Sequence, residues 1–433
     1  MFNFSIPTLT AGPSEYSTKL ASISPKRSSN FINLVSILFV SLLFAGCGEW
    51  EGDYVNPYVA GSHAYWFYDA DFELLEANYT NPGEVIDLDS KKSKYGTDWY
   101  LAQSAVPIEG GFLPNKKTGF YAIPNVIEIS DQAELSSVRN NLSGTYIVLE
   151  DIELQAGKVG FDATAGWTPI GDETVPFKGI FNGNGRKISG LWIDRPSDNC
   201  VGLFGRIEGG NIKKLGVLTD ETEGVKGLSK VGIIAGCVET YSTITLSYSA
   251  GNVGGDYFIG GIAGNVAFDS KITNAYSKAN AVEGNYVGGI AGSIGGSSEV
   301  TNTYSIGNIS GINYVGGIAG EVTSGAMAIN NAAINQNNDG LINVHRIAAI
   351  INDLSELVSN NFALDTMNIN IDGVVGNDGT PKSDALLKTR LTYEGEIDGD
   401  GNGGLGWQFG DNASHPWKID EGADYPYLYW EDR

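Results

Sequence analysis

One short motif recurs every 28 residues in the middle of the chain. It runs Val/Ile-Gly-Gly/Ile-Ile-Ala-Gly and occupies residues 231–236, 259–264, 287–292 and 315–320. A fixed period of this size means that each unit is one supersecondary element that cannot bury its apolar face alone, so successive units must stack. The sequence therefore predicts a solenoid.

Other side chains keep the same 28-residue register. On stacked parallel strands, equivalent residues lie about 4.8 Å apart, where amides can hydrogen-bond and aromatic rings can stack. The expected ladders are Tyr248, Tyr276 and Tyr304; Asn252, Asn280 and Asn308; Asn274, Asn302 and Asn330; and Phe258, Tyr286 and Tyr314. Amide and aromatic ladders of this kind favour a β-helix.

Helical repeats are the competing architecture. Residues 298–305 are rich in β-branched and aromatic residues, and every glycine in a repeat would cost a helix about 1 kcal/mol relative to alanine. The pairs Gly260-Gly261, Gly288-Gly289 and Gly316-Gly317 indicate a bend or a close approach of backbones. We therefore expect an all-β chain.

The first 46 residues predict secretion. Lys19, Lys26 and Arg27 precede an apolar run at 31–45, which is short for a membrane span at about 15 residues. The small pair Ala45-Gly46 before Cys47 resembles the lipobox of bacterial lipoproteins, which implies that Cys47 is lipidated. Phe44 departs from the branched aliphatic residue usual in that family, and the leader is long. Ordinary secretion is the alternative.

Residues 48–53 are acidic and resemble the signal that directs lipoproteins of the Bacteroidetes type to the outer face of the outer membrane. A polar tether is the alternative. We expect a lipid-anchored protein of the outer membrane, exposed at the surface. Cys200 and Cys237 lie near the Gly-rich turns of neighbouring repeats and could pair in such an oxidising compartment. The preferred interpretation is that both are small buried apolar residues, because neither has a periodic partner.

The segment 47–124 lacks the repeat and is dense in aromatic residues. It is expected to be an N-terminal extension or a small β domain whose aromatic side chains form its core, with sugar stacking as the alternative. A short helix is expected after Asp131, because Glu134 follows it and Leu135, Val138 and Leu142 share one helical face. Such a helix would cap the open end of the solenoid.

The segments 166–171, 177–191 and 201–205, together with the repeats and the Trp-rich tail, resemble bacterial proteins that carry the GLUG motif. The resemblance covers residues 125–433. It implies a right-handed parallel β-helix, as in surface adhesins; such repeats also flank the protease domains of some immunoglobulin A peptidases. We expect the β-helix to span 125–351, with a degenerate last coil at 346–351. Residues 352–433 would form its C-terminal end and cap, including a short helix near 383–387.

Few residues suggest catalysis. His63, His345 and His415 do not form a His-Glu-x-x-His zinc motif, and neither a Gly-x-Ser-x-Gly elbow nor a P-loop is present. The repeats carry few charges, and no two carboxylates recur at a spacing that suggests an acid and base pair.

One loop resembles a ligand site. Asp398, Asp400 and Asn402 match the first half of a calcium loop, but Phe409 stands where the closing acidic residue belongs. An acidic Gly-rich turn is the preferred alternative. No other cofactor is expected.

The net charge of −24 argues against nucleic acid as a partner. The favoured function is a cell-surface lipoprotein whose rigid β-helix serves adhesion or binding of an extracellular glycan or protein. A lyase or hydrolase acting on polysaccharides is the second possibility, and a purely structural envelope protein is the third.

Overall fold

The computed structural model describes residues 62–323, 325–351, 358–369, 378–395 and 404–431. The leader 1–46, Cys47 and the expected calcium loop with Asp398, Asp400 and Asn402 lie outside the described residues.

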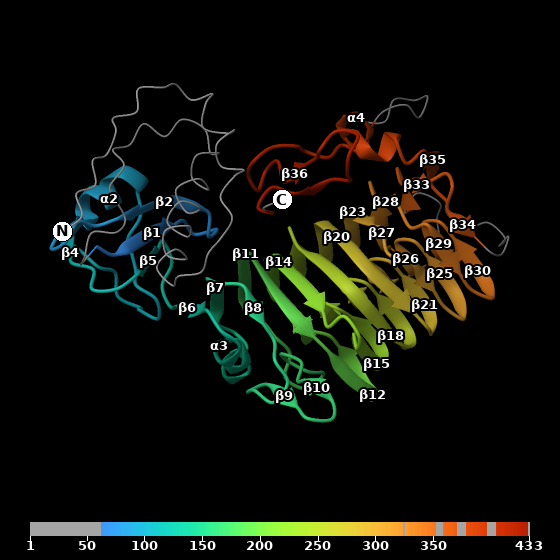
Figure 1. The fold of residues 1–433 in the computed structure, drawn as a ribbon, viewed down its shortest axis with the longest axis horizontal. Helices are drawn as coiled ribbons and strands as arrows, with labels where there is room; N and C mark the ends of the chain where they lie inside the picture. The colour runs from blue at the N-terminus through green and yellow to red at the C-terminus, as the bar shows by residue number, and fades with distance from the viewer. Residues whose placement is uncertain (1–61, 324, 352–357, 370–377, 396–403, 432–433) are drawn as a thin grey trace, which may run out of the picture. The chain divides into compact units, whose positions relative to one another are not determined.

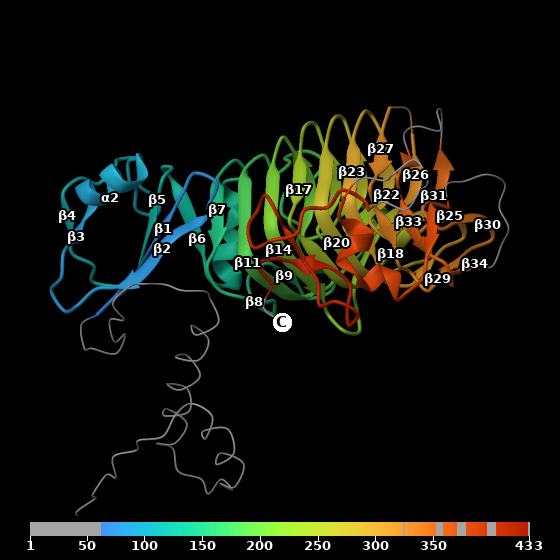
Figure 2. The ribbon, with the colours of Figure 1, turned by 90° about the horizontal axis from the view of Figure 1, so that it is seen from above.

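The repeats form a β-solenoid of stacked parallel coils (Figure 1). One face is a six-stranded parallel sheet to which each coil adds one strand, with register pairs such as Ala263 with Ala291 and Ala291 with Ala319. Its strands are β13 (Phe204–Glu208), β16 (Ala235–Glu239), β19 (Ala263–Ala267), β22 (Ala291–Ile294), β26 (Ala319–Val322) and β31 (Ala348–Ile351). Figure 2 shows the coils following one another along the stack.

Longer strands form the other faces of the coils. β18 pairs in parallel with β15 before it and β20 after it, and Tyr248 stands opposite Tyr276. The strands up to the middle of the stack are β6 (Val126–Ile129), β7 (Thr145–Val148), β8 (Ile152–Glu153), β9 (Phe161–Asp162), β10 (Gly166–Trp167), β11 (Ile180–Leu191), β12 (Ile193–Val201), β14 (Asn211–Thr219), β15 (Val225–Gly232), β17 (Thr243–Thr245), β18 (Tyr248–Gly260) and β20 (Lys271–Val282).

The later coils have shorter strands, and the spacing between their paired residues is no longer constant. Val315 pairs with Val344, and Ala332 pairs with Phe362, so the period lengthens from 28 to 29 and then 30 residues. These strands are β21 (Asn285–Gly288), β23 (Glu299–Ser305), β24 (Ile309–Ser310), β25 (Asn313–Gly316), β27 (Met327–Ile329), β28 (Ala332–Ala333), β29 (Asn337–Asp339), β30 (Ile342–His345), β32 (Val358–Ser359), β33 (Phe362–Leu364), β34 (Asn368–Ile369) and β35 (Thr380–Lys382). The expectation that 346–351 ends the stack was wrong, because β32, β33 and β34 continue it.

The solenoid interior is filled by rows of small and branched apolar side chains. The central Ile of the motif is fully buried in every coil, as Ile234, Ile262, Ile290, Ile318 and Ile347. Burial of each such side chain contributes roughly 1.5–3 kcal/mol. These rows explain why the motif recurs.

The Gly pairs stand where backbones come close. A Cβ added to Gly288 would lie 2.0 Å from the carbonyl oxygen of Ala291, and one added to Gly289 would lie 2.2 Å from that of Gly317. A side chain does not fit in that space, so Gly288 and Gly289 cannot gain a side chain unless the backbone shifts.

The part of the chain before the solenoid contains a three-stranded sheet, of strand order β2-β1-β5, and a short helix. Phe67 lies in its core, stacked on Phe120 at 4.7 Å and edge-on to Trp99 at 4.6 Å. The aromatic side chains here thus build a hydrophobic core. The elements are β1 (Ala64–Tyr68), β2 (Leu74–Tyr79), β3 (Ile86–Asp87), α2 (Leu88–Tyr95), β4 (Gly111–Phe112) and β5 (Thr118–Tyr121).

A helix is present at the expected place after β6. α3 (Gln132–Ser137) begins at Asp131, whose carboxylate accepts a hydrogen bond from the backbone N–H of Glu134 at 2.9 Å. The Glu134 carboxylate in turn accepts a hydrogen bond from the backbone N–H of Ser130, the residue before the N-cap, at 2.7 Å. A 3₁₀ turn, η3 (Val138–Asn140), follows.

The C-terminal segment differs from the expected end cap. After η4 (Leu386–Lys388) and α4 (Arg390–Tyr393), residues 404–431 run back along one side of the coils and include β36 (Trp417–Lys418) and β37 (Tyr427–Leu428). Trp430, near the end of the described chain, stacks on Tyr248 at 5.7 Å, although Tyr248 belongs to an early repeat. The tail therefore covers a lateral face.

Candidate surface binding face

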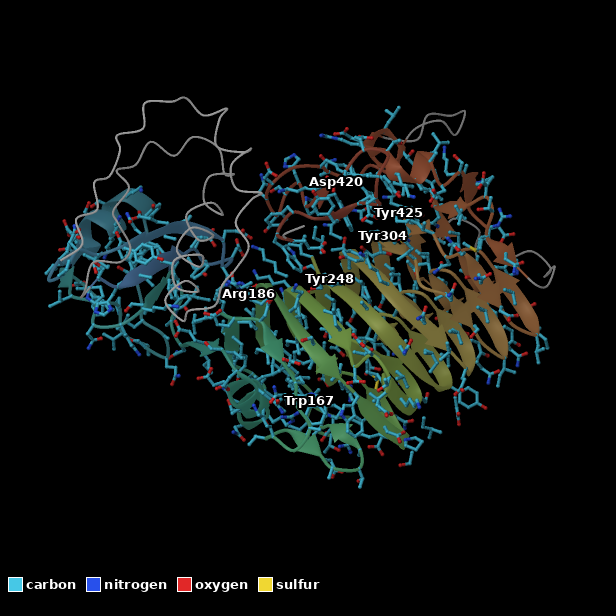
Figure 3. The ribbon with its side chains drawn as sticks, viewed as in Figure 1. Trp167, Arg186, Tyr248, Tyr304, Asp420 and Tyr425 are labelled. Atoms are coloured by element: carbon cyan, nitrogen blue, oxygen red, sulfur yellow. A yellow bond between two sulfur atoms is a disulfide. The ribbon has the colours of Figure 1, made fainter. Side chains whose placement is uncertain are left out.

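Three equivalent tyrosines form a ladder beneath the tail. The ring centroids of Tyr248 and Tyr276 are 5.0 Å apart and those of Tyr276 and Tyr304 are 4.8 Å apart, with nearly parallel planes. Their side chains are buried, and Tyr276 and Tyr304 have no exposed surface. Figure 3 shows Tyr248 and Tyr304 between the strands and the segment that carries Tyr425. This ladder is therefore part of the core and does not face solvent.

The tail satisfies the polar atoms of this ladder. The hydroxyl of Tyr276 donates a hydrogen bond to the Glu431 carboxylate at 2.6 Å, and that of Tyr304 donates to the carbonyl of Pro426 at 2.7 Å. The Trp430 indole donates to the carbonyl of Leu246 at 3.1 Å. Burial raises the pKa of Tyr276 well above its usual value, so the phenol stays protonated.

The second expected ladder follows one edge of the solenoid. The amide of Asn280 donates to Asn252 Oδ1 at 3.2 Å, and the backbone N–H of Asn308 donates to Asn280 Oδ1 at 3.1 Å. Asn337 and Asn368 extend the row through further amide contacts at 3.1 and 3.4 Å. The amides therefore bond mainly to one another along the stack.

The third ladder marks a turn in each coil. Asn274, Asn302 and Asn330 all adopt the left-handed region, with φ of 50°, 53° and 60°. Asparagine tolerates this conformation better than most residues, which explains its recurrence. Asn302 Nδ2 donates to Asn274 Oδ1 at 3.4 Å, and the carbonyl of Asn330 accepts a hydrogen bond from the Trp407 indole at 2.9 Å. These residues therefore have structural roles.

The aromatic row Phe258, Tyr286 and Tyr314 also reaches the surface. Its ring centroids are 4.9 and 4.7 Å apart, and all three side chains are half-buried. Both faces of the Tyr286 ring are covered by its neighbours in the row, so ring edges remain for other contacts. Each residue of the row has a backbone φ near 60°. The next coil has Asn343 at the same register position, also with a positive φ.

A second row of polar side chains lies beside the aromatic row. Ser293 Oγ donates to the Glu321 carboxylate at 3.1 Å. Burial raises the pKa of Glu321, and the hydrogen bond from Ser293 partly offsets this effect. Burial followed by the nearby Glu321 charge also raises the pKa of Tyr286. Hydroxyl, carboxylate and phenol groups therefore lie close together at this edge.

A disulfide joins these two rows at their N-terminal end. Cys200 shares the register of the aromatic row, Cys237 shares that of Asn265 and Ser293, and the two form a disulfide with Cα atoms 5.1 Å apart. The preferred interpretation of two unlinked buried cysteines was wrong, although both are buried. The partners belong to different rows of adjacent coils, so a search at multiples of 28 residues misses them.

Two buried serine rows were also missed. Ser242, Ser270 and Ser298 follow the 28-residue period, and the hydroxyls of Ser270 and Ser298 accept hydrogen bonds from the backbone N–H of Ser242 and Ser270, each at 3.1 Å. Ser249 donates to Ser277 at 3.1 Å in a second row. Their spacing was visible in the sequence and could have identified them.

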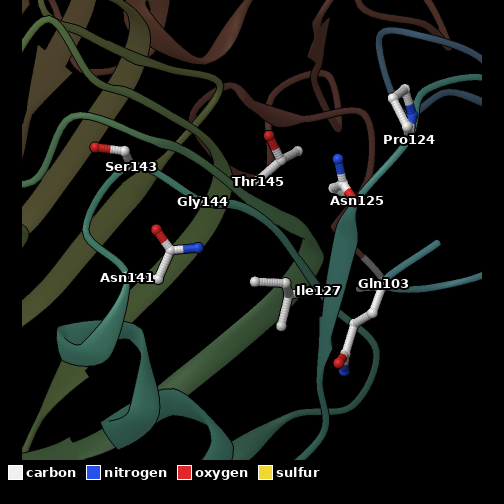
Figure 4. Close-up of a pocket in the computed structure, with 8 residues that line it drawn as sticks. All are labelled: Gln103, Pro124, Asn125, Ile127, Asn141, Ser143, Gly144 and Thr145. Atoms are coloured by element: carbon white, nitrogen blue, oxygen red, sulfur yellow. The ribbon is translucent and has the colours of Figure 1, made fainter. Parts of the chain in front are cut away.

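Hollows on the surface of the described residues include two that are shallow and open. One, of about 540 Å³, lies where the N-terminal part meets the first coil (Figure 4) and is lined mainly by polar groups, including Gln103, Asn125, Asn141 and Thr145. The other, of about 570 Å³, lies at the corner between β18, β21 and β25 and includes Asp256, Tyr257 and Glu283. Its lining includes Tyr257 and Asn285, which directly precede Phe258 and Tyr286 of the aromatic row.

The described residues provide little for catalysis or metal binding. They contain no group of three His, Cys, Asp or Glu side chains arranged to hold a metal ion. Of the three histidines, His345 is buried and lies 3.4 Å from the Asp378 carboxylate, an interaction that lowers the pKa of Asp378. The backbone N–H of His63 donates to the Thr80 hydroxyl, and the His415 ring lies 3.4 Å from Asn412 Oδ1 in a turn. The histidines therefore do not converge on one site.

Comparisons with known proteins bear on the fold. No family model matches the chain. A protein of Evansella cellulosilytica, whose name describes a Gly-rich membrane protein, is 39% identical over 118 residues. Halomucin of Haloquadratum walsbyi is 30% identical over 146 residues. These matches span 26% and 31% of this chain but only 13% and 2% of the relatives.

A crystal structure of a Bacteroides ovatus protein named as an immunoglobulin A1 protease has the same fold. It aligns with a TM-score of 0.51 at 21% identity and covers 72% of this chain and 93% of that chain. The similarity shows a β-solenoid and nothing about activity. Within the described part of the chain, no helix is long and apolar enough to cross a membrane.

Proposed function

We propose that this chain is a surface-displayed lipoprotein whose β-solenoid binds an extracellular partner without transforming it. The observation that carries the proposal is the half-exposed aromatic row Phe258, Tyr286 and Tyr314 beside a surface hollow. Rigid solenoids present such rows in fixed register along the stack, which suits binding.

The N-terminal sequence and the relatives support a surface location. The lipobox-like residues around Cys47 would attach the mature chain to the outer membrane, and one relative is named as a membrane protein. The resemblance to GLUG-repeat adhesins is consistent with this location. The proposed partners are an extracellular glycan or a protein.

An enzyme acting on polysaccharides is the second candidate. The carboxylate beside the aromatic row, Glu321, has a raised pKa, as a general acid requires. Its nearest polar partner, however, is the Ser293 hydroxyl, whereas a glycosidase needs a second carboxylate across the scissile bond. We therefore rank binding first.

One assay separates these functions. The purified mature chain should be screened against arrays of glycans and extracellular proteins, and the supernatants should be analysed for new reducing ends, unsaturated sugars and cleaved peptides. Retention of a partner with no product supports binding. Product formation that disappears in Glu321→Gln would replace the proposal with the enzyme.

A further inference from the structure

Exposed apolar side chains gather at one corner of the later coils. Tyr257, Ile312, Leu341 and Ile342 are between 48% and 68% exposed. Ile312 and Leu341 occupy one register position of successive coils, and Tyr257 and Ile342 belong to the neighbouring position. We call these four residues, together with Asp256 and Glu283, the corner patch.

The repeat does not require this apolar surface. At the register position of Ile312, the two preceding coils have Gly284 and Asp256, so the position tolerates glycine and a charged residue. Clustered exposed apolar side chains on a folded surface mark contact sites for other molecules. Stacking of the coils therefore does not explain why the corner patch is apolar, whereas contact with another molecule does.

Three glycines, Gly255, Gly284 and Gly311, line the hollow of about 570 Å³ at this corner. The backbone is closely packed here, because a Cβ at Gly284 would lie 2.3 Å from the carbonyl oxygen of Gly255. Tyr257 and Ile312 also line the hollow. A side chain of a partner could enter there.

The charges at the hollow determine what would enter. Asp256 and Glu283 both line it and are exposed, and within the described residues neither carboxylate forms an ion pair. A guanidinium or ammonium group placed between them would be attracted by both carboxylates and could lie over the Tyr257 ring. The chain as a whole carries −24, which also favours a basic partner.

We propose that the corner patch docks a segment of a partner protein in which an Arg or Lys is flanked by apolar residues. The basic side chain enters the hollow, and the apolar neighbours cover Ile312 and Leu341. A glycan fits less well, because the aromatic rings next to the hollow stack on one another and leave few ring faces for sugars. This inference rests on the proposed binding function and names its partner class.

The test uses the purified chain without its lipid and a library of ten-residue peptides in which one Arg has apolar neighbours. Matched peptides carry Gln for Arg or Ser for the apolar residues, and neutral oligosaccharides are screened in parallel. Dissociation constants are measured at low and physiological salt. Variants that melt at the wild-type temperature are compared.

We expect Asp256→Asn with Glu283→Gln to weaken binding of the Arg peptides roughly 5- to 20-fold at low salt and to remove most of the salt dependence. Ile312→Ser with Leu341→Ser should weaken it without changing the salt dependence. Glu223→Gln and Tyr241→Asn, at exposed turns elsewhere, serve as matched controls and should leave affinity unchanged.

Each other outcome has a definite meaning. Peptide binding that is equal in the corner variants and the controls would overturn the corner patch and leave the binding function standing. Oligosaccharide binding that depends on the corner, with no peptide binding, would overturn the partner class. Absence of any partner in these screens and in the wider arrays would overturn the inference and the proposed function together.

Discussion

Gly289→Ala is the smallest change that tests how tightly the coils approach. The added Cβ would lie 2.0 Å from Ser305 Oγ and 2.2 Å from the carbonyl oxygen of Gly317, whereas real contacts of this kind need about 3.0 Å. Relief requires a displacement of about 1 Å for the hydroxyl and 0.8 Å for the carbonyl. The hydroxyl can rotate away, but the carbonyl belongs to the backbone of the next coil, between β25 and β26.

We expect Gly289→Ala to lower the free energy of unfolding by about 2–3 kcal/mol. Overpacking of a tight interior costs roughly 1–3 kcal/mol, and a displaced backbone places this site at the upper end. Replacing glycine also lowers the conformational entropy of the unfolded chain, which stabilises the folded state by about 0.4–1 kcal/mol. Gly289→Val, with a larger side chain, should cost more.

The measurement is urea unfolding followed by far-UV circular dichroism and by fluorescence of the buried Trp407 and Trp417. Gly295→Ala is the matched control, because its Cβ would meet only the Thr323 hydroxyl, at 2.7 Å. Ser305→Ala should not rescue Gly289→Ala, since the Gly317 carbonyl remains. Equal midpoints for the two Gly variants, or complete rescue by Ser305→Ala, would refute the backbone-contact argument.

Four further outcomes are expected. Deleting 286–313, one full period, should preserve the circular dichroism spectrum, whereas deleting 286–299 should unfold the chain; equal damage from both would contradict the solenoid register. Cys47→Ser should release the protein from the membrane fraction, and undiminished membrane association would exclude anchoring at that residue. Glu321→Gln should raise the free energy of unfolding at neutral pH. Burial raises the pKa of Glu321 on folding, so its carboxyl increasingly destabilises the folded chain as pH rises from the unfolded pKa through the folded pKa. A difference in urea midpoint between variant and wild type that does not increase from pH 4 to pH 7 would argue against this burial effect. Trp417→Ala should cost about 3–5 kcal/mol and make the tail sensitive to proteases, and an unchanged digestion pattern would show that the tail is held by other contacts.

The periodic half of the structure could be predicted because its contacts repeat. The stacked coils, the rows of Tyr and Asn and the tight Gly positions all follow from one spacing, since residue i lies beside residue i+28. The serine rows obey the same rule, and their 28-residue spacing is present in the sequence. Beyond Val315 the period lengthens to 29 and 30 residues, so a constant 28-residue spacing does not predict the last coil.

The remaining contacts have no periodic signal. Tyr276 meets Glu431 across 155 residues and Tyr304 meets Pro426 across 122, and the tail carries no repeat that would indicate its partner. The disulfide between Cys200 and Cys237 joins neighbouring rows at a separation of 37 residues. The corner patch depends on exposure and on the shape of turns, which an isolated sequence does not reveal.

The position of the tail has a consequence for assembly of the chain during synthesis. Residues 404–431 are made after the coils, yet they cover the tyrosine ladder of repeats made much earlier. The coils can stack in order as they emerge, with an open aromatic strip along one side until the tail arrives. During that interval the tail of a second molecule offers the same hydrogen bonds and rings. Two chains at high local concentration can therefore exchange tails and emerge as a domain-swapped dimer.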